Sequence, residues 1–171
     1  MNLVSDNSLA DVWRRHFLDS AQVYDLVRGL AGPLVDLGSG AGFPGLVLSI
    51  MGVPDVHLIE SDQKKAAFLV DTVRKCGATA KVHACRIEAF SAVRPAAITA
   101  RALAPMPKLM KLAYPLFSKG TRGIFLKGQN VVAELTEAHK MWKMDYDLVP
   151  SRSDPSGTLV VVREVSRVKS D

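Results

Sequence analysis

The chain has 171 residues, of which 48% are hydrophobic and 23% are charged. This length suits one domain with a substantial core and is short for two, because domains usually run about 100 to 150 residues. No apolar run approaches the roughly 20 residues that span a bilayer, and residues 1–30 are too charged for a signal peptide. The sequence therefore excludes the membrane classes and predicts a single cytoplasmic domain over residues 1–171.

The net charge of +5 is unevenly placed, because residues 1–60 are acidic on balance and residues 61–171 carry the basic excess. This asymmetry suits a polyanionic partner, although solvated helix faces explain it equally well. Cys76 and Cys85 form no C-x-x-C pair, and the four histidines lack the i, i+4 spacing of a metal-binding helix. No metal site is predicted.

The first predicted element is one long helix over about residues 8–31. Its possible N-cap oxygens are in residues 6–8, and apolar residues then recur three or four positions apart from Leu9 to Leu30. Gly32-Pro33 ends the pattern. His16 lies beside the apolar stripe, so it is expected to pack rather than to catalyse.

After Pro33 the sequence alternates between short apolar runs and helical patterns. The runs predict strands at 34–37, 56–60, 80–83, 97–100 and 123–127, and the patterns between them predict helices at 43–51, 63–76, 107–114 and 131–142. Residues 146–149 and 158–165 then read as a closing antiparallel hairpin. The sequence predicts an α/β fold with a mostly parallel seven-stranded sheet and helices on both faces.

A glycine-rich loop follows the first predicted strand. Gly38, Gly40 and Gly42 stand where open α/β sheets bind ligands, directly beyond the carboxyl end of a strand. Glycine tolerates a positive φ and has no Cβ, so a bulky cofactor can approach the turn and the following helix. Asp36, at the strand end, is expected to hold the loop amides or to contact the amino acid part of a cofactor.

The loop alone fits two kinds of adenosine cofactor. Residues 40–45 satisfy G-x-G-x-x-G, and Glu60 lies where a dinucleotide site keeps its ribose-binding carboxylate. Every adenosine cofactor has ribose hydroxyls, so Glu60 serves S-adenosylmethionine equally well. Only residues 128–171 follow the fifth strand, which is short for the catalytic domain of a dehydrogenase. Methyl transfer needs less, because the sulfonium is already activated, and a methyltransferase is therefore favoured.

Missing motifs narrow the methyl acceptor. Enzymes that methylate exocyclic base nitrogens usually carry Asn/Asp-Pro-Pro-aromatic after the fourth strand, where this chain has residues 99–103 as Thr-Ala-Arg-Ala-Leu. Methylation at pyrimidine carbon 5 needs a nucleophilic cysteine, which neither Cys76 nor Cys85 supplies in the usual context. Guanine N7 fits, because its lone pair carries no proton and needs no general base. Another RNA or a small molecule as acceptor, and a noncatalytic dinucleotide-binding module, remain alternatives.

Six segments in order along nearly the whole chain resemble the ribosomal RNA small subunit methyltransferase G family, also called glucose-inhibited division protein B. They are residues 3–5, 15–20, 36–45, 86–88, 99–102 and 126–128. The resemblance implies a Rossmann-like class I methyltransferase fold, S-adenosylmethionine as cofactor, and N7 methylation of a guanine in 16S ribosomal RNA. The family usually has further helices before the segment that is Asn2 to Ser5 here, whereas in this sequence only Met1 precedes it. We expect this departure to alter substrate docking and to leave the fold and the cofactor site unchanged.

The resemblance also implies cofactor contacts at particular positions. Glu88 would accept from the adenine amino group, Ile87 would flank the ring, and Arg101 would hold the cofactor carboxylate or position the RNA. Together with the loop analysis, the expected cofactor-binding residues are Asp36, Gly38, Gly40, Gly42, Phe43, Glu60, Ile87, Glu88 and Arg101. No catalytic base is expected. The partner is 16S ribosomal RNA or the small subunit, bound by a monomer, with contact candidates Arg14, Arg15, Lys64, Lys65, Arg122 and Lys127.

Overall fold

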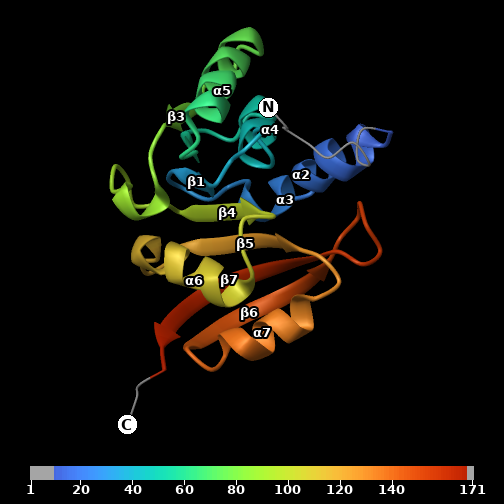
Figure 1. Ribbon diagram of the computed structural model, residues 1–171, viewed down its shortest axis with the longest axis vertical. Coiled ribbons are helices and arrows are strands. Elements are labelled where there is room, and N and C mark those ends of the chain that lie inside the picture. The colour runs from blue at the N-terminus through green and yellow to red at the C-terminus, as the bar shows by residue number, and fades with distance from the viewer. Residues whose placement is uncertain (1–9, 169–171) are drawn as a thin grey trace.

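One seven-stranded sheet forms the frame of residues 10–168, the part of the chain that the computed structural model describes (Figure 1). The strand order is β3-β2-β1-β4-β5-β7-β6. The bounds are β1 Leu34–Leu37, β2 Val56–Ile59, β3 Lys81–His83, β4 Ala97–Arg101, β5 Arg122–Lys127, β6 Trp142–Pro150 and β7 Thr158–Arg167. Strands β1 to β5 pair in parallel, whereas β7 is antiparallel to both β5 and β6. The predicted parallel sheet and closing hairpin are confirmed.

Helices cover both faces of this sheet. They are α4 Gly45–Ile50, α5 Gln63–Lys75, α6 Met106–Ala113 and α7 Val131–Ala138, with short 3-10 turns η2 Ile87–Ala89 and η3 Tyr114–Leu116. Successive strand side chains point to opposite faces, and the core is divided accordingly. Leu34 packs in the cluster that contains residues of α4 and α5, while Val35 packs in the cluster that contains residues of α6 and α7.

The opening segment differs from the single long helix that was predicted. It consists of a π-helical turn η1 Trp13–Leu18, a short α2 Asp19–Ala21 and α3 Tyr24–Val27. The Ser20 hydroxyl donates to the His16 carbonyl at 2.6 Å, a contact of the kind that bends helices because it competes for the helical acceptor. The residue pattern could not show this break. Residues 3–8, which carry the predicted N-cap and the first resemblance segment, lie outside the described residues.

Helix α7 ends earlier than the sequence predicts. The predicted range was 131–142, but the helix stops at Ala138 and Trp142 begins β6. The Trp142 side chain is buried, with its ring 4.9 Å from that of Tyr114, and its backbone pairs with Arg167 in β7. Burial in the sheet therefore overrides the local helical pattern. None of the helices within residues 10–168 is long and apolar enough to cross a membrane.

Candidate functional site

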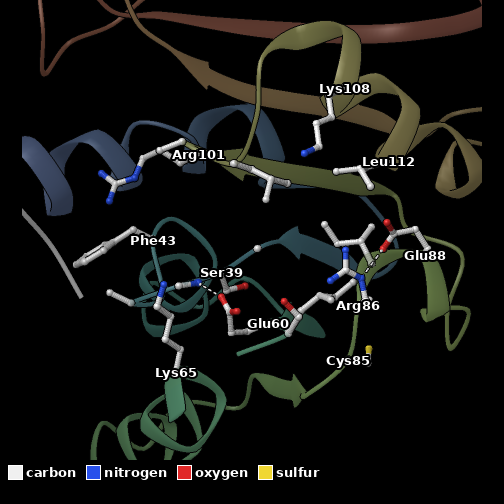
Figure 2. Close-up of a pocket in the computed structure, with 18 residues that line it drawn as sticks. Ser39, Phe43, Glu60, Lys65, Cys85, Arg86, Glu88, Arg101, Lys108 and Leu112 are labelled. Atoms are coloured by element: carbon white, nitrogen blue, oxygen red, sulfur yellow. Dashed lines mark hydrogen bonds and ion pairs between the residues drawn. The ribbon is translucent and has the colours of Figure 1, made fainter. Parts of the chain in front are cut away.

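A cavity of about 440 Å³ opens at the carboxyl ends of β1, β2 and β4. Figure 2 shows its walls, with Phe43 and Arg101 at one end and Arg86 and Glu88 at the other. This is the edge of the sheet at which open α/β folds bind ligands. Seven residues expected to bind a cofactor line it, namely Gly38, Gly40, Phe43, Glu60, Ile87, Glu88 and Arg101.

Glu60 and the glycine loop form one wall of this cavity. The Gly40 N–H donates to Glu60 Oε2 at 2.9 Å, and the Asp62 N–H donates to Oε1 at 2.8 Å. Gly40 has a φ of +55°, and a Cβ there would meet only the Gly38 carbonyl oxygen, at 3.8 Å. The loop backbone is thus open to the cavity. A carboxylate can accept about four hydrogen bonds, so each Glu60 oxygen retains capacity for a ribose hydroxyl, and the wall fits an adenosine cofactor.

Asp36 and Gly42 stand behind the loop and do not line the cavity. Asp36 is fully buried and accepts from the Thr99 hydroxyl at 2.7 Å and from the Gly45 N–H at 3.3 Å. Burial raises the pKa of Asp36 to about 6. A Cβ at Gly42 would lie 2.9 Å from the Leu46 Cβ, so this glycine permits close packing. Of the two roles considered for Asp36, holding the loop amides is the one that its contacts display.

The opposite wall combines η2 with α6. Ile87 and Glu88 lie on η2, and the Glu88 carboxylate is 3.8 Å from the Arg86 guanidinium. Lys108 and Leu112 complete the wall from α6, and sequence reasoning missed both. Their spacing of four places them on one face of that helix, so a signal was present. Nothing in that spacing showed that the face would point at the cofactor loop.

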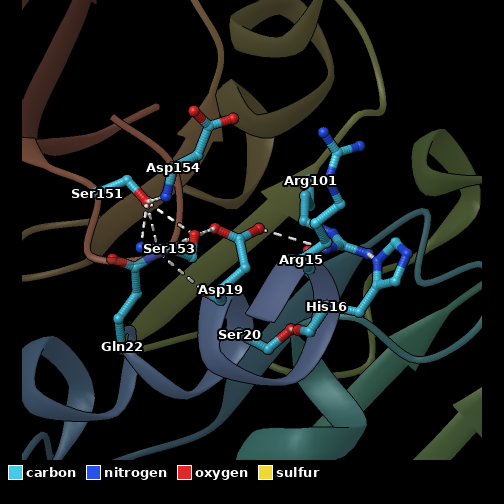
Figure 3. A network of polar contacts seen from close by, with 9 residues as sticks. All are labelled: Arg15, His16, Asp19, Ser20, Gln22, Arg101, Ser151, Ser153 and Asp154. Atoms are coloured by element: carbon cyan, nitrogen blue, oxygen red, sulfur yellow. Dashed lines mark hydrogen bonds and ion pairs between the residues drawn. The ribbon is translucent and has the colours of Figure 1, made fainter. Parts of the chain in front are cut away.

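Arg101, at the cavity wall, forms hydrogen bonds with the opening segment (Figure 3). One guanidinium nitrogen donates to the Arg15 carbonyl at 3.0 Å and to Asp19 Oδ2 at 3.3 Å, and the other faces His16 Nδ1 at 2.8 Å. The group also lies 5.0 Å from the centre of the Phe43 ring, on which His16 stacks. Burial, and then the Arg101 charge, lower the pKa of His16. The neutral imidazole can accept from Arg101, which protonation at Nδ1 would prevent.

The six basic residues proposed for RNA contact have different surroundings. Lys65 lines the cofactor cavity, and Lys64 is exposed at the start of α5. The Lys127 side chain is 9% exposed, and its ammonium lies 2.6 Å from Glu134. Arg122 begins β5, at the end of the strand away from the cavity, and donates to the Leu26 carbonyl at 2.9 Å. These contacts disfavour Lys127 and Arg122 as phosphate ligands.

Arg14 and Arg15 lie beside the cofactor cavity without lining it. Both are exposed, and both line a neighbouring cavity of about 460 Å³ together with His16, Asp19 and Arg101. Within residues 10–168, no group of three or more His, Cys, Asp or Glu side chains could hold a metal ion.

Two solved structures with a similar fold are a methyltransferase and a methylase by their descriptions. One is magnesium protoporphyrin IX methyltransferase from Synechocystis PCC 6803 with bound SAM, with a TM-score of 0.69 and 12% identity, covering 96% of this chain and 87% of that one. Another is the ribosomal protein L11 methylase from Lactobacillus delbrueckii subsp. bulgaricus, with a TM-score of 0.62 and 16% identity, covering 86% and 78%. The fold is that of the Rossmann-like class I methyltransferases.

Sequence comparison gives the family within this class. The family model described as rRNA small subunit methyltransferase G matches residues 1–153. A relative of that name from Rhodospirillum rubrum is 47% identical over 98% of this chain and 83% of its own length. Another, from Rhodospirillum centenum, is 51% identical over 97% and 77%. The chain belongs to the rRNA small subunit methyltransferase G family, which confirms the predicted family and the enzyme class, an S-adenosylmethionine-dependent methyltransferase.

Proposed function

We propose that this chain transfers the methyl group of S-adenosylmethionine to N7 of a guanine in 16S ribosomal RNA. The observation that carries the cofactor part of the proposal is the Glu60 carboxylate, which backbone amides of Gly40 and Asp62 fix at the cavity wall. The ribosomal RNA acceptor rests on the family to which the chain belongs. In a member of the rRNA small subunit methyltransferase G family, that wall has the acceptor groups and the open backbone that an adenosyl group requires.

The residues of the chain bind and orient, and no general base is needed. Bound S-adenosylmethionine would supply a methyl group already activated by a sulfonium. Guanine N7 offers an in-plane lone pair without a proton, so attack requires alignment and exclusion of water. Glu60 and the glycine loop would hold the cofactor, with Ile87 and Glu88 across the cavity. Arg101, which lines both this cavity and its neighbour, is a positioning residue between cofactor and RNA.

We propose that a monomer binds RNA through the exposed side chain of Arg15. Arg14 lies beside it, but its guanidinium already pairs with Asp11 and donates to the Ser153 carbonyl. Lys and Arg contacts to phosphate release counterions, so RNA affinity should fall steeply as salt is added. Titration of RNA at several salt concentrations measures this dependence. A flat response would instead favour a small-molecule acceptor.

The decisive experiment is labelled methyl transfer to small ribosomal subunits that lack the modification, followed by mapping of the modified base. We expect the label on N7 of one guanine. Label on another atom, or none with a folded enzyme that binds S-adenosylhomocysteine, would refute the proposed acceptor. Calorimetric binding of NAD but not of S-adenosylhomocysteine would refute the cofactor and favour a dinucleotide-binding module.

A further inference from the structure

Another cavity, which we call the second cavity, adjoins the cofactor cavity on the side of β5. It is distinct from the cavity that Arg14 and Arg15 line. Its volume is about 360 Å³, within the range of about 300 to 1,000 Å³ that is common for ligand sites. The two cavities share Arg101 and Ala102, which lie at and directly after the end of β4. The remaining wall comes from the end of β5, the start of β7, the connection between β6 and β7, Asp19 and Glu134. A ligand here would therefore meet the cofactor across the end of β4.

Glu134 is held rigidly at this second cavity. The Lys127 ammonium lies 2.6 Å from Glu134 Oε2, and the Met106 N–H donates to the same oxygen at 2.9 Å. Lys127 is fixed in turn, because it also donates to the Ala104 carbonyl at 2.9 Å. Both contacts to the carboxylate use Oε2, so Oε1 keeps its capacity to accept from a ligand. The Glu134 side chain is 22% exposed, and it lines the second cavity but not the first.

The other carboxylates of the second cavity are less suited to bind a ligand. Asp19 Oδ1 accepts from the Ser153 hydroxyl at 2.6 Å and from Gln22 at 2.9 Å, while its Oδ2 faces Arg101 (Figure 3). Asp154 is exposed, and its Oδ1 accepts from the backbone and hydroxyl of Ser156. Glu134 alone among these three combines a cationic partner on one oxygen with capacity on the other.

We propose that Glu134 is a specificity-determining residue that accepts from the N1–H and 2-amino groups of the target guanine in this second cavity. The inference rests on the proposed function. Guanine N7 lies on the major-groove edge of the base, and the 2-amino group lies on the opposite side. A guanine that turns N7 toward the cofactor cavity therefore turns its N1–H and 2-amino groups toward other walls of the second cavity. Adenine lacks both donors, so the same carboxylate oxygen rejects it.

Glu134→Gln converts this acceptor into a donor with little change in volume. Two donors, Lys127 and the Met106 N–H, occupy the Oε2 position, so the amide oxygen must take that place. The NH₂ group then replaces Oε1. The variant would thus present a donor to the two guanine donors while it keeps the contacts that hold α7, β5 and α6 together.

The test compares single-turnover methyl transfer to small-subunit RNA that carries either guanosine or inosine at the mapped position. Inosine keeps N7 and N1–H but lacks the 2-amino group. We expect the wild-type enzyme to be about tenfold slower on inosine, and Glu134→Gln to be about tenfold to a hundredfold slower on guanosine, the range for leaving polar groups unpaired. The guanosine preference should disappear in the variant.

The matched control is Glu137→Gln on the same helix, where the carboxylate is 59% exposed and paired with Lys140 outside the cavity. It should behave like the wild type on both RNAs. An equal loss of rate on both RNAs in Glu134→Gln would show a purely structural role and overturn the proposal. So would loss of the preference in Asp154→Asn but not in Glu134→Gln.

The wild-type comparison also separates this proposal from the proposed function, and it needs no variant that has to fold. An enzyme active on both RNAs without preference would overturn the role of Glu134 and leave the methyltransferase intact. An enzyme that methylates neither RNA, although it binds S-adenosylhomocysteine, would overturn both.

Discussion

The two sides of the site are built in different ways. On the cofactor side, Glu60 contacts Gly40, which is 20 residues away, and Asp36 contacts Gly45, which is nine residues away. On the acceptor side, Arg101 contacts Arg15 across 86 residues, and Asp19 contacts Ser153 across 134. The loop of the cofactor side is held by carboxylates that accept from nearby backbone amides, and Asp36 also accepts from Thr99 across 63 residues. The acceptor side is held by side chains that the whole fold brings together.

Because the two sides are held differently, substitutions on each side should impair different properties of the protein. The backbone amides of the loop donate to the carboxylates of Glu60 and Asp36. A larger side chain in the loop, or loss of one of these carboxylates, should therefore impair folding or cofactor binding. The acceptor side is a network in which Asp19, Gln22, Ser151 and Ser153 join the opening segment to the connection between β6 and β7 (Figure 3). Damage there should leave the cofactor bound and reduce transfer.

The largest effects should come from two glycines, Gly40 in the loop after β1 and Gly45 at the start of α4. A Cβ at Gly45 would lie 2.5 Å from Leu58 Cδ2 and 2.6 Å from Asp36 Cβ, so Gly45→Val should destabilise the fold by about 3 kcal/mol through overpacking. A side chain at Gly40 would enter the cofactor cavity without a clash in the core, but Gly40 has a positive φ. Gly40→Val should cost about 1 to 2 kcal/mol in backbone strain and abolish binding of S-adenosylhomocysteine.

Chemical denaturation and calorimetry measure these two glycine effects separately. Unchanged affinity in a folded Gly40→Val protein would remove the loop from the site. Equal losses of stability in the two variants would contradict the assignment of Gly45 to core packing and of Gly40 to cofactor binding.

The next effect concerns the carboxylate of the cofactor side. Glu60→Ala removes the acceptor for the amides of Gly40 and Asp62, and it removes the proposed ribose ligand. We expect binding of S-adenosylhomocysteine to weaken by about 1 to 3 kcal/mol, the range for losing a charged hydrogen-bond partner. Calorimetric titration of the variant measures it. An effect well below this range would show that Glu60 serves only the loop.

The cofactor side was the more predictable of the two because its signals are local. The glycines between residues 38 and 45 follow a predicted strand, and Glu60 ends the next one. The edge where parallel strands end is a general ligand site. The sequence alone did not distinguish Gly40, which is open to the cavity, from Gly42, which packs on Leu46. That distinction depends on how α4 and α5 pack, which no spacing shows.

The acceptor side was largely beyond sequence reasoning. Lys127 was a candidate for RNA contact, and the fold instead pairs it with Glu134, a residue that no sequence pattern singled out. The opening segment, from which Asp19 contacts Ser153, is also broken into short pieces, although its apolar pattern predicted one regular helix. Parallel sheet, helices and hairpin follow from periodicity, whereas contacts across 80 or more residues depend on the assembled fold.

A smaller effect should come from the Arg101 ion pair. Asp19→Asn keeps an oxygen for the Ser153 hydroxyl but removes the charge that faces Arg101. We expect a loss of stability of about 1 kcal/mol, a clear fall in methyl transfer and little change in affinity for S-adenosylhomocysteine. The control is Asp25→Asn, because Asp25 forms exposed ion pairs worth about 0 to 1 kcal/mol.

Denaturation, calorimetry and single-turnover rates distinguish the two aspartate variants. If Asp19→Asn weakened cofactor binding as much as it slowed transfer, the two sides of the site would not be separable in function.

The smallest effect should be the pH dependence that His16 adds to the acceptor side. Burial and the Arg101 charge lower the pKa of His16 below its ordinary value, so between the folded and unfolded values the unfolded chain binds more protons. Stability from this group is therefore complete above about pH 6.5 and is lost as the pH falls through the folded value. The pKa of His83 is also lowered, by burial and then by His57, so the wild-type curve contains both groups.

Subtracting the stability curve of His16→Gln from that of the wild type isolates His16, since His83 titrates in both proteins. The difference should change only below about pH 6.5. The rate of methyl transfer should also fall in acid, where a protonated imidazole repels Arg101. The rate should stay constant from about pH 7 to 9, because N7 has no proton for a histidine to remove. A rate that rose tenfold per pH unit with deprotonation of one group, and lost that rise in His16→Gln, would instead make His16 the base. The acceptor side would then perform proton transfer as well as positioning.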